Sequence, residues 1–223
     1  MRNTVTQLPD GRLEKRYRGT LAWKRETGLL SRMRGSGLVP ELLETPSGRA
    51  VMARCPGIPL GEGIRTASPD EARAMMAALA AWTGAFEREF CRRTGETAAL
   101  EDFSPGNFLW DAESRTVTGL DFEFWHTGSP AENRGGLLCM AERLKGAALT
   151  GEELAAELKR QFGGGTDPAE LERWADAARR QAELRRRAMP LIRQTAGVIL
   201  AGGKSSRMGS PKALLRWKDG CFL

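Results

Sequence analysis

The stretch Asp102-Phe103-Ser104-Pro105-Gly106-Asn107 and the later stretch Gly119-Leu120-Asp121-Phe122-Glu123 decide the fold expected for this chain. Asp102 and Asn107 lie on one short loop, so their side chains can face the same cleft. Asp121 follows a predicted strand, Thr116 to Leu120, which would place its carboxylate opposite that loop. The three side chains offer only oxygen atoms, which are the ligands that Mg2+ prefers.

This pattern suits phosphoryl transfer, which needs a group that orients the attacking hydroxyl, ligands for magnesium and cations for the nucleotide phosphates. It predicts Asp102 as the catalytic residue that accepts or orients the hydroxyl proton, with Asn107 and Asp121 as metal ligands. Asp and Asn also favour turns for local reasons, so three turn or strand-end residues without a shared chemistry are the alternative interpretation.

The two stretches, in this order and distance, resemble the aminoglycoside phosphotransferase-like branch of the protein-kinase fold, which includes choline and lipopolysaccharide-core kinases. The resemblance covers about residues 4–190. It implies that Lys15 contacts the nucleotide phosphates and that Glu26, on the following helix, is its ion-pair partner. It also implies a hinge between two lobes at Val51-Met52-Ala53-Arg54, before Pro56-Gly57.

The chain departs from this family in three places. Leu100-Glu101 stands where members usually carry His-Gly before the catalytic aspartate. Only 14 residues precede Lys15, fewer than a complete first hairpin and a glycine-rich cover over the phosphates need. Asn133 stands where these kinases often have a further structural aspartate.

Turn, capping and periodicity signals predict alternating strands and helices with a mainly helical second half. Pro9-Asp10-Gly11-Arg12 has hairpin turn chemistry, and Ser68-Pro69-Asp70-Glu71 combines an N-cap serine with proline at the first helical position. Residues 55–61 are predicted to be a connecting loop, and Met189-Pro190 is predicted to end the last helix. The other expected elements are strands at 4–8, 13–17, 39–44, 49–54, 107–110 and 116–120, and helices at 20–34, from 69, at 134–145, from 151 and from 168.

A second motif runs from Gly197 to Lys212. It is not a Walker A loop, because the first glycine of that pattern would fall at Val198. Gly202 and Gly203 would let backbone amides approach phosphate oxygens, and Arg207 and Lys212 would balance triphosphate charge as pyrophosphate leaves. A basic loop that closes the first domain is the alternative.

The string Leu-Ala-Gly-Gly-x-Ser-x-Arg-Met-Gly-x-x-Lys, beginning at Leu200 and Ala201, resembles the start of molybdenum cofactor guanylyltransferase and its nucleotidyltransferase relatives. The resemblance covers about residues 196–223 and implies GTP as the nucleotide of a completed domain. A doubly wound domain needs several βα units of about 30 residues each. We therefore expect an incomplete nucleotidyltransferase domain at 192–223, with the first strand, the phosphate loop and the start of a helix, after a kinase-like domain at 1–191. The sequence also predicts a piece of a longer fusion.

Composition is that of an ordinary core-forming protein, with 41% hydrophobic and 28% charged residues among 223. No apolar run approaches the roughly 18 to 20 residues that span a bilayer, and no secretory signal is visible. Four dispersed cysteines and one histidine, His126, argue against zinc knuckles, disulfide frameworks and catalytic triads, and favour a cytoplasmic location. The net charge of +6 fits a phosphate-bearing small molecule. Few aromatics interleave with the arginines between Arg179 and Arg193, so nucleic acid is not predicted as a partner.

The sequence thus predicts an α+β fold: a two-lobed protein-kinase-like domain with a shortened N-lobe and a mainly helical C-lobe, then an incomplete Rossmann-like βα unit. The expected activity is ATP-dependent, magnesium-assisted phosphorylation of a hydroxyl on a small molecule. Two alternatives stay open: a GTP-dependent molybdenum cofactor guanylyltransferase with most of its catalytic domain missing, and a pseudokinase module that binds nucleotide or a partner without turnover.

Overall fold

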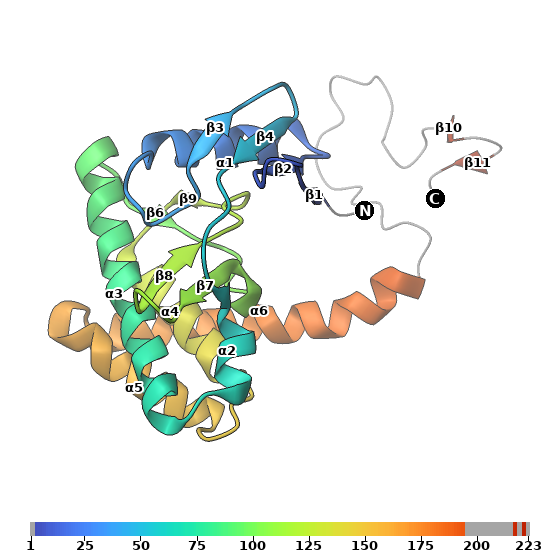
Figure 1. Cartoon of the computed structure of the whole chain (residues 1–223). Helices are drawn as coiled ribbons and strands as arrows, with labels where there is room; N and C mark the ends of the chain where they lie inside the picture. The colour runs from blue at the N-terminus through green and yellow to red at the C-terminus, as the bar shows by residue number, and fades with distance from the viewer. Residues whose placement is uncertain (1–2, 195–215, 218–219, 222–223) are drawn as a thin grey trace. The chain divides into compact units, whose positions relative to one another are not determined.

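The computed structural model describes residues 3–194, 216–217 and 220–221 and contains two compact units, Met1–Arg179 and Arg180–Leu223. The first unit begins with a four-stranded antiparallel sheet in the order β1-β2-β4-β3, and α1 packs against this sheet (Figure 1). These elements are β1 (Thr4–Gln7), β2 (Leu13–Arg16), α1 (Thr20–Arg32), β3 (Leu42–Glu44) and β4 (Arg49–Met52).

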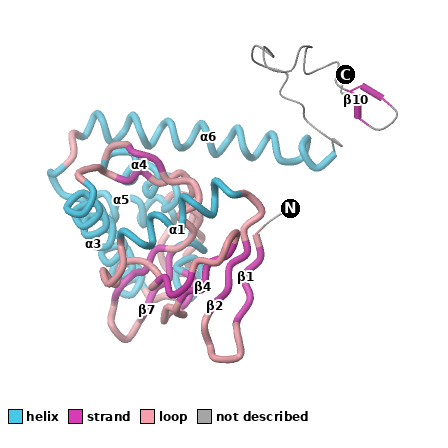
Figure 2. The backbone as a smooth tube through the Cα atoms, turned by 90° about the horizontal axis from the view of Figure 1, so that it is seen from above, coloured by secondary structure: helices cyan, strands magenta, loops and turns pink. Residues whose placement is uncertain are grey.

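The register of this sheet buries polar side chains on one of its strands. The predicted hairpin around Pro9-Asp10-Gly11-Arg12 forms, and it pairs Val5 with Lys15, while on the other side of β2 Lys15 pairs with Ala50 of β4. Figure 2 shows β1, β2 and β4 side by side. Lys15 is only 6% exposed. A lysine is almost never fully buried unless it is paired. We therefore expect carboxylates inside the protein to pair with the ammonium group of Lys15.

Helices dominate the second part of this unit, and α3 is the helix whose apolar stripe contributes most to its core. Its elements are α2 (Leu60–Thr66), α3 (Pro69–Thr94), α4 (Pro130–Ala141), α5 (Gly151–Phe162) and the first part of α6 (Pro168–Gln194). The predicted capping box holds at α3, where the Ser68 hydroxyl accepts a hydrogen bond from the Glu71 amide and Glu71 accepts one from the Ser68 amide. Its apolar stripe, including Leu79, Phe86 and Phe90, is buried in the core.

Two small sheets lie between these parts and carry the predicted motifs. The first has the order β5-β7-β8 and the second pairs β6 with β9. Their strands are β5 (Ile58–Pro59), β6 (Ala98–Ala99), β7 (Phe108–Asp111), β8 (Thr116–Gly119) and β9 (His126–Thr127). A 3-10 turn at Pro105–Asn107 leads into β7, and a second one occupies Gly163–Gly165. The loop after β6 therefore holds Asp102, and the segment after β8 holds Asp121.

The predicted loop at 55–61 is wrong, because it contains β5 and the start of α2. Gly61 and Gly63 weaken the helical signal of this segment. Leu60 and Ile64 nevertheless point to one face and are buried, so packing overrides propensity. The predicted helix at 134–145 instead spans Pro130–Ala141, and the Glu132 carboxylate accepts a hydrogen bond from the Ser129 amide at its start.

The last helix continues past Met189-Pro190 to Gln194, so its predicted end is also wrong. A proline removes one intrahelical hydrogen bond, which weakens a helix without always ending it. In the second unit, β10 (Arg216–Trp217) and β11 (Gly220–Cys221) form an antiparallel pair. The predicted first strand of the nucleotidyltransferase domain, before the phosphate loop, lies outside the described residues, and so do the loop residues Leu200, Ala201, Gly202, Gly203, Arg207 and Lys212.

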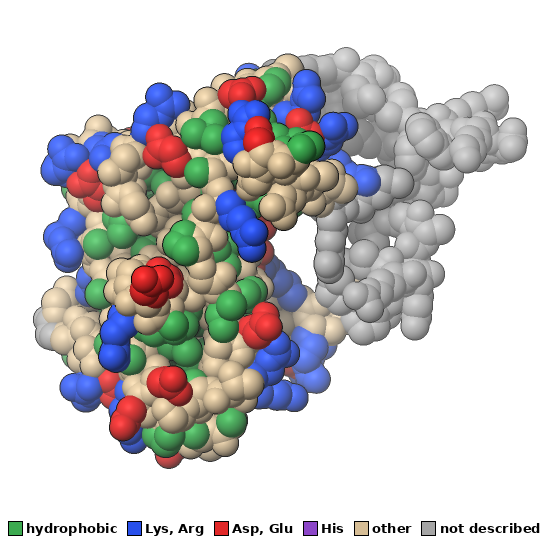
Figure 3. Space-filling view, in the orientation of Figure 1, with side chains coloured by type: hydrophobic (Ala, Val, Ile, Leu, Met, Phe, Trp, Pro, Cys, Tyr) green, Lys and Arg blue, Asp and Glu red, His purple; other side chains and the backbone are tan. Residues whose placement is uncertain are grey.

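The basic surplus lies in the second unit, because residues 1–179 carry 24 Lys and Arg against 26 Asp and Glu, whereas residues 180–223 carry 10 against 2. Figure 3 shows Lys and Arg side chains scattered among acidic ones over the face in view. On α6, Arg179 contacts Glu142, Glu172 and Asp176, and Arg186 contacts Glu183. Among the described residues, no helix is both long enough and apolar enough to cross a membrane.

The close packing of β8 on α3 gives the first prediction. A Cβ atom added at Gly119 would lie 2.3 Å from Cζ2 of Trp82 and 3.0 Å from Cζ of Phe122. Gly119→Ala should therefore lower the free energy of unfolding by about 1–3 kcal/mol through overpacking. In Gly84→Ala, inside α3, the new Cβ atom contacts only the flexible tip of Arg88. This substitution should raise the free energy of unfolding by about 0.5–1 kcal/mol. Urea denaturation measures both, and the same sign for the two variants would contradict this packing.

Candidate functional site

A cavity of about 930 Å³ opens between the first sheet and the helical part of the first unit. Leu13 of β2 and Met52 of β4 line it from the sheet, and Leu109 of β7 and Leu120 line it from the other part. Between β4 and β5, Ala53 and Arg54 of the predicted hinge line the cavity, together with Cys55 and Gly57 that follow it. Lys15, Glu26, Asp102, Asn107, Asp121 and Glu123 complete the polar lining.

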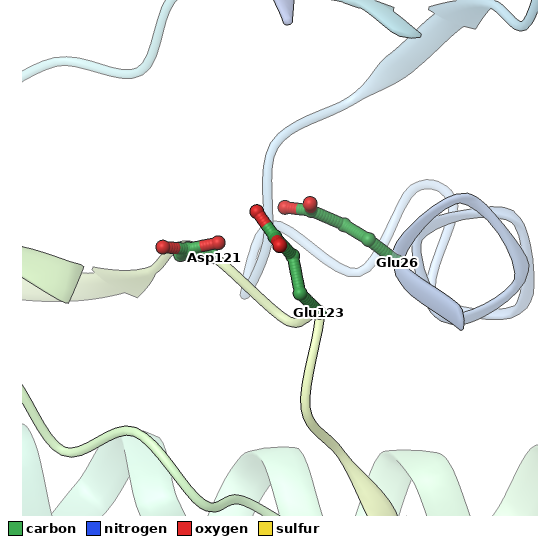
Figure 4. Close-up of side chains that lie close together, drawn as sticks. All are labelled: Glu26, Asp121 and Glu123. Carbon is green, nitrogen blue, oxygen red and sulfur yellow. The ribbon is translucent and has the colours of Figure 1, made fainter. Parts of the chain in front are cut away.

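Lys15 is the centre of this polar lining. Its Nζ lies 2.7 Å from Oε2 of Glu26, 2.7 Å from Oδ1 of Asp121 and 2.8 Å from Oε1 of Glu123. Figure 4 shows the three carboxylates converging from α1 and from the segment after β8. The Lys15 ammonium donates hydrogen bonds to Glu26 and Asp121, and it forms an ion pair with Glu123. We call these four residues the lysine cluster.

The lysine cluster carries a surplus of negative charge, since one cation faces three carboxylates. Burial alone would lower the pKa of Lys15, but the charges of Glu26 and Asp121 outweigh it and raise that pKa above its ordinary value. Burial raises the pKa of Glu26 above its ordinary value, although Lys15 opposes this. The side chains of Lys15, Glu26 and Glu123 are at most 9% exposed, whereas that of Asp121 is 38% exposed. Asp121 is thus the member with access to solvent and to a ligand.

Glu26 fastens α1 to the segment after β8. One of its carboxylate oxygens binds Lys15, and the other accepts a hydrogen bond of 3.3 Å from the backbone amide of Phe122. Nearby, the indole of Trp125 donates to the carbonyl oxygen of Arg25 at 2.9 Å. Phe122 is buried and stacks on Phe86 of α3. The segment therefore has one face in the core and the other in the cavity.

Asp121 takes an unusual backbone conformation for a residue other than glycine, with φ at 60°. Aspartate tolerates this left-handed region better than most residues, but it is still uncommon and often marks a functional position. The preceding amide, that of Leu120, donates to the carbonyl oxygen of Asn107 at 2.7 Å. This bond joins the Asp121 segment to the loop that carries Asp102.

The loop from Asp102 to Asn107 is ordered by its own polar groups. The Asp102 carboxylate accepts a hydrogen bond from the Ser104 amide at 3.1 Å, and the Asn107 side-chain amide donates to the Asp102 carbonyl oxygen at 3.3 Å. Phe103 lies directly against α4, where a Cβ atom at Gly136 would be 2.1 Å from its ring. The absence of a side chain at Gly136 therefore lets α4 seat the loop.

The structure brings all five sequence-predicted residues of the first unit, Lys15, Glu26, Asp102, Asn107 and Asp121, to one cavity. Glu123 belongs to the same motif, but the sequence alone predicts no role for it. The polar–apolar–polar order of Asp121-Phe122-Glu123 was the available signal, because Phe122 is buried in the core while both carboxylates line the cavity. Asn3 was also missed: its side chain donates to Glu123 and accepts from the Arg18 amide at 3.0 Å.

The donor set of the cavity fits a magnesium ion. Asp121, Asn107 and Asp102 line the same cavity, and carboxylate oxygens of Glu26, Asp121 and Glu123 lie within 4.8 Å of one another, a set of oxygen ligands that suits a divalent cation. Asp121 is partly exposed and would reach such an ion most easily.

Solved structures share this fold over most of the chain. The streptomycin-ATP complex of APH(2'')-IIa superposes with a TM-score of 0.61 over 86% of this chain and 87% of that chain, at 10% identity. ADP-bound aminoglycoside phosphotransferase APH(2'')-Ib gives a TM-score of 0.58 over 87% and 82%, at 12% identity. Aminoglycoside phosphotransferase APH(3'')-Id from Streptomyces rimosus gives 0.57 over 77% and 87%, at 14% identity. The chain has the aminoglycoside phosphotransferase-like kinase fold.

The C-terminal segment has different relatives. Residues 197–223 match the MobA-like NTP transferase domain family. A probable molybdenum cofactor guanylyltransferase of Bacillus mycoides (strain KBAB4) is 61% identical over 28 residues, which are 13% of this chain and 14% of that protein. A short MobA-like segment therefore follows the kinase-like fold, as the sequence predicted.

The lysine cluster predicts a pH-dependent loss of stability in Lys15→Met, which leaves three carboxylates without their cation. Breaking a buried ion pair by removing one partner costs about 3–5 kcal/mol. The raised pKa of Glu26 makes its contribution to stability fall as pH rises through that pKa, and loss of Lys15 raises the pKa further. Lys15→Met should therefore be destabilised more at about pH 8 than at about pH 5.

Urea unfolding at both pH values measures this effect, with Lys24→Met, an exposed lysine on the same helix as Glu26, as the matched control. The control should stay close to the parent protein at both values. An equal loss for Lys15→Met at the two pH values would contradict the charge balance described for the cluster.

Proposed function

We propose that the first unit is an ATP-dependent phosphotransferase that phosphorylates a hydroxyl group of a small molecule. The observation that carries this proposal is the convergence of Lys15, Asp102, Asn107 and Asp121 on one cavity beside the hinge. The kinase-like fold supports it, and so do two structural neighbours that were solved with ATP and with ADP. The cavity volume falls within the range of small-molecule sites.

The apolar half of the cavity suits a purine base. Leu13 and Met52 on one side and Leu109 and Leu120 on the other form two apolar walls. The hinge between β4 and β5 offers backbone groups at the far end, although the Ala53 amide already donates to the carbonyl oxygen of Glu41 at 2.9 Å. In this arrangement the base lies against the hinge and the phosphates point toward Lys15.

Nucleotide binding requires an exchange of partners at Lys15. Its ammonium is already paired with three carboxylates, so a phosphate oxygen competes with them, and we expect it to displace one of them. Asp121 is the most exposed of the three and the one best placed to turn toward Mg2+, together with Asn107. Glu26 and Glu123 keep Lys15 in position. Mg2+ would neutralise phosphate charge in this site, and its binding and the release of Lys15 are coupled.

Asp102 acts on the acceptor. Its carboxylate is fixed by the Ser104 amide at the edge of the cavity and can accept or orient the proton of an attacking hydroxyl. General acid–base assistance of this kind contributes about 10²- to 10⁴-fold. The identity of the acceptor depends on surfaces other than these polar residues.

The C-terminal segment supports a second candidate function. Its identity to a probable molybdenum cofactor guanylyltransferase over 28 residues favours a nucleotide-binding loop. In this proposal, Leu200, Ala201, Gly202 and Gly203 bring backbone amides to the phosphates of GTP, and Arg207 and Lys212 balance their charge. Because the match covers 14% of that protein, guanylyl transfer belongs to a longer domain than these residues form.

Titration calorimetry with ADP, with and without Mg2+, tests the partner exchange. The parent protein should bind ADP more tightly with Mg2+ than without it. Asp121→Asn should lose this magnesium dependence and bind metal-free ADP at least as tightly as the parent, because a neutral amide competes less strongly for Lys15 and no longer repels the phosphates. Asp70→Asn, which alters an aspartate with a 97% exposed side chain on α3, is the matched control and should behave as the parent. Magnesium-dependent binding that survives in Asp121→Asn would contradict the assigned site.

Turnover of Mg2+-ATP separates the phosphotransferase from a pseudokinase. Asp102→Ala should keep ADP affinity and lower the rate of ATP hydrolysis by about 10²-fold or more. A parent protein that binds Mg2+-ADP but shows no hydrolysis above the Asp102→Ala level would identify a nucleotide-binding module without turnover.

A further inference from the structure

A second group of buried polar side chains lies behind the loop that carries Asp102, outside the cavity. It contains Glu87 of α3 and Asn133 and Arg134 of α4. Glu87 is 6% exposed and Asn133 is 2% exposed. Burial of a carboxylate and an amide costs free energy unless each finds partners. The hydrogen-bond partners of Glu87 and Asn133 indicate the structural role of these side chains.

Asn133 holds the backbone that leads into the loop. Its side-chain oxygen accepts a hydrogen bond of 2.8 Å from the Leu100 amide, two residues before Asp102. Its side-chain nitrogen donates to the carbonyl oxygen of Ala98 at 2.9 Å. The side-chain amide of Asn133 therefore bonds to the backbone of residue 98 and of residue 100, at the end of β6. No carboxylate could make both bonds, because an ionised carboxylate has no donor.

Glu87 fixes the orientation of that amide. Its Oε1 accepts a hydrogen bond of 3.4 Å from the same Asn133 nitrogen, and its Oε2 accepts one of 3.0 Å from Arg134. The Asn133 nitrogen must face two acceptors, so its oxygen is left for Leu100. Burial raises the pKa of Glu87, and the positive charges of Arg134 and, more weakly, Arg88 oppose this shift.

We propose that Asn133 and Glu87 form a single positioning unit for Asp102 and that this unit requires an amide at position 133. This inference rests on the proposed phosphotransferase function only for the role of Asp102; the geometry of the unit stands apart from it. Asn133 fixes Leu100, Phe103 seats on Gly136 one turn further along α4, and Asp102 lies between these two anchors. The unit acts on the loop, whereas the lysine cluster acts on the phosphates.

A carboxylate at position 133 would work against the loop. It could still accept from Leu100, but its other oxygen would face the Ala98 carbonyl oxygen and the Glu87 carboxylate at the distances that now hold hydrogen bonds. Both contacts would become repulsive. Protonation of the new carboxyl would restore a donor, so the defect should shrink as pH falls. The charged groups that face this position are Glu87 and Arg88 of α3 and Arg134 of α4.

Hydrogen exchange of the Leu100 amide, measured by NMR as a protection factor, tests the unit without any need for turnover. Asn133→Ala should lower the protection of Leu100 by about tenfold or more, because a buried hydrogen bond is lost. Thr83→Ala is the matched control: it removes a buried hydroxyl on α3, one turn before Glu87, that bonds only to the Leu79 carbonyl oxygen. The control should leave Leu100 protection, relative to the α3 amides, unchanged. Equal Leu100 protection in Asn133→Ala and the parent would overturn the proposal.

Two further variants keep the test decisive if Asn133→Ala does not fold. Asn133→Asp should lower Leu100 protection at about pH 8 and recover it toward about pH 5, as the new carboxyl gains a proton. The double variant Glu87→Gln with Asn133→Asp exchanges the two groups and keeps the charge beside Arg134, so it should recover part of the protection at about pH 8. A double variant no better than Asn133→Asp would overturn the coupling between Glu87 and Asn133.

Turnover distinguishes this inference from the proposed function. In a parent protein that hydrolyses Mg2+-ATP, Asn133→Asp should lower kcat by about tenfold at neutral pH and leave KM for ATP nearly unchanged, because Lys15 and Asp121 stay in place. A change in KM alone would overturn the positioning role. A parent protein without hydrolysis would count against the phosphotransferase, while the Leu100 protection would still decide whether Asn133 and Glu87 hold the loop.

Discussion

The ammonium group of Lys15, held by three carboxylates, is the interaction on which the rest of the first unit depends. The sheet places Lys15 where water cannot solvate it, so carboxylates must do so instead. Glu26 comes from α1, while Asp121 and Glu123 come from the segment after β8. A buried cation paired with both parts of the unit joins them through charge as well as through packing. Three carboxylates surround one ammonium group, so the cluster favours a positively charged ligand.

Hydrogen bonds and aromatic packing fix the backbone around the lysine cluster. Asp121 keeps a left-handed conformation because its neighbours on both sides are fixed, Leu120 by Asn107 and Phe122 by Glu26 and the α3 aromatics. A strained residue persists only where its surroundings over-determine it. Behind the cavity, α4 holds the loop that carries Asp102. The Asn133 side-chain amide bonds to the Leu100 backbone, and Phe103 packs on Gly136. The site is therefore built on rigid elements, and Asp121 is the group with freedom to change partners.

Parts of this fold could be predicted from local sequence because the chemistry itself is local. The capping box at Ser68 and the stripe of α3 follow from neighbouring residues, and so does the hairpin turn that positions Lys15. The helix α2 could not be predicted, because Gly61 and Gly63 give a weak signal that only tertiary packing overcomes. The partnership of Asn133 with Glu87 joins residues 46 positions apart and leaves no local signature. Glu123 is an intermediate case. The polar–apolar–polar order of its motif is visible in the sequence, but its role as a partner of Lys15 cannot be assigned without the position of Lys15.

A crystal structure of the protein with Mg2+ and ADP tests the central claim most directly. The account predicts ADP in the cavity beside the hinge, with a phosphate oxygen on Nζ of Lys15 in place of Asp121. Asp121 and Asn107 should then bind the metal ion, while Glu26 keeps its contact with Lys15. Nucleotide bound elsewhere on the first unit, with Lys15 still holding all three carboxylates, would contradict the account.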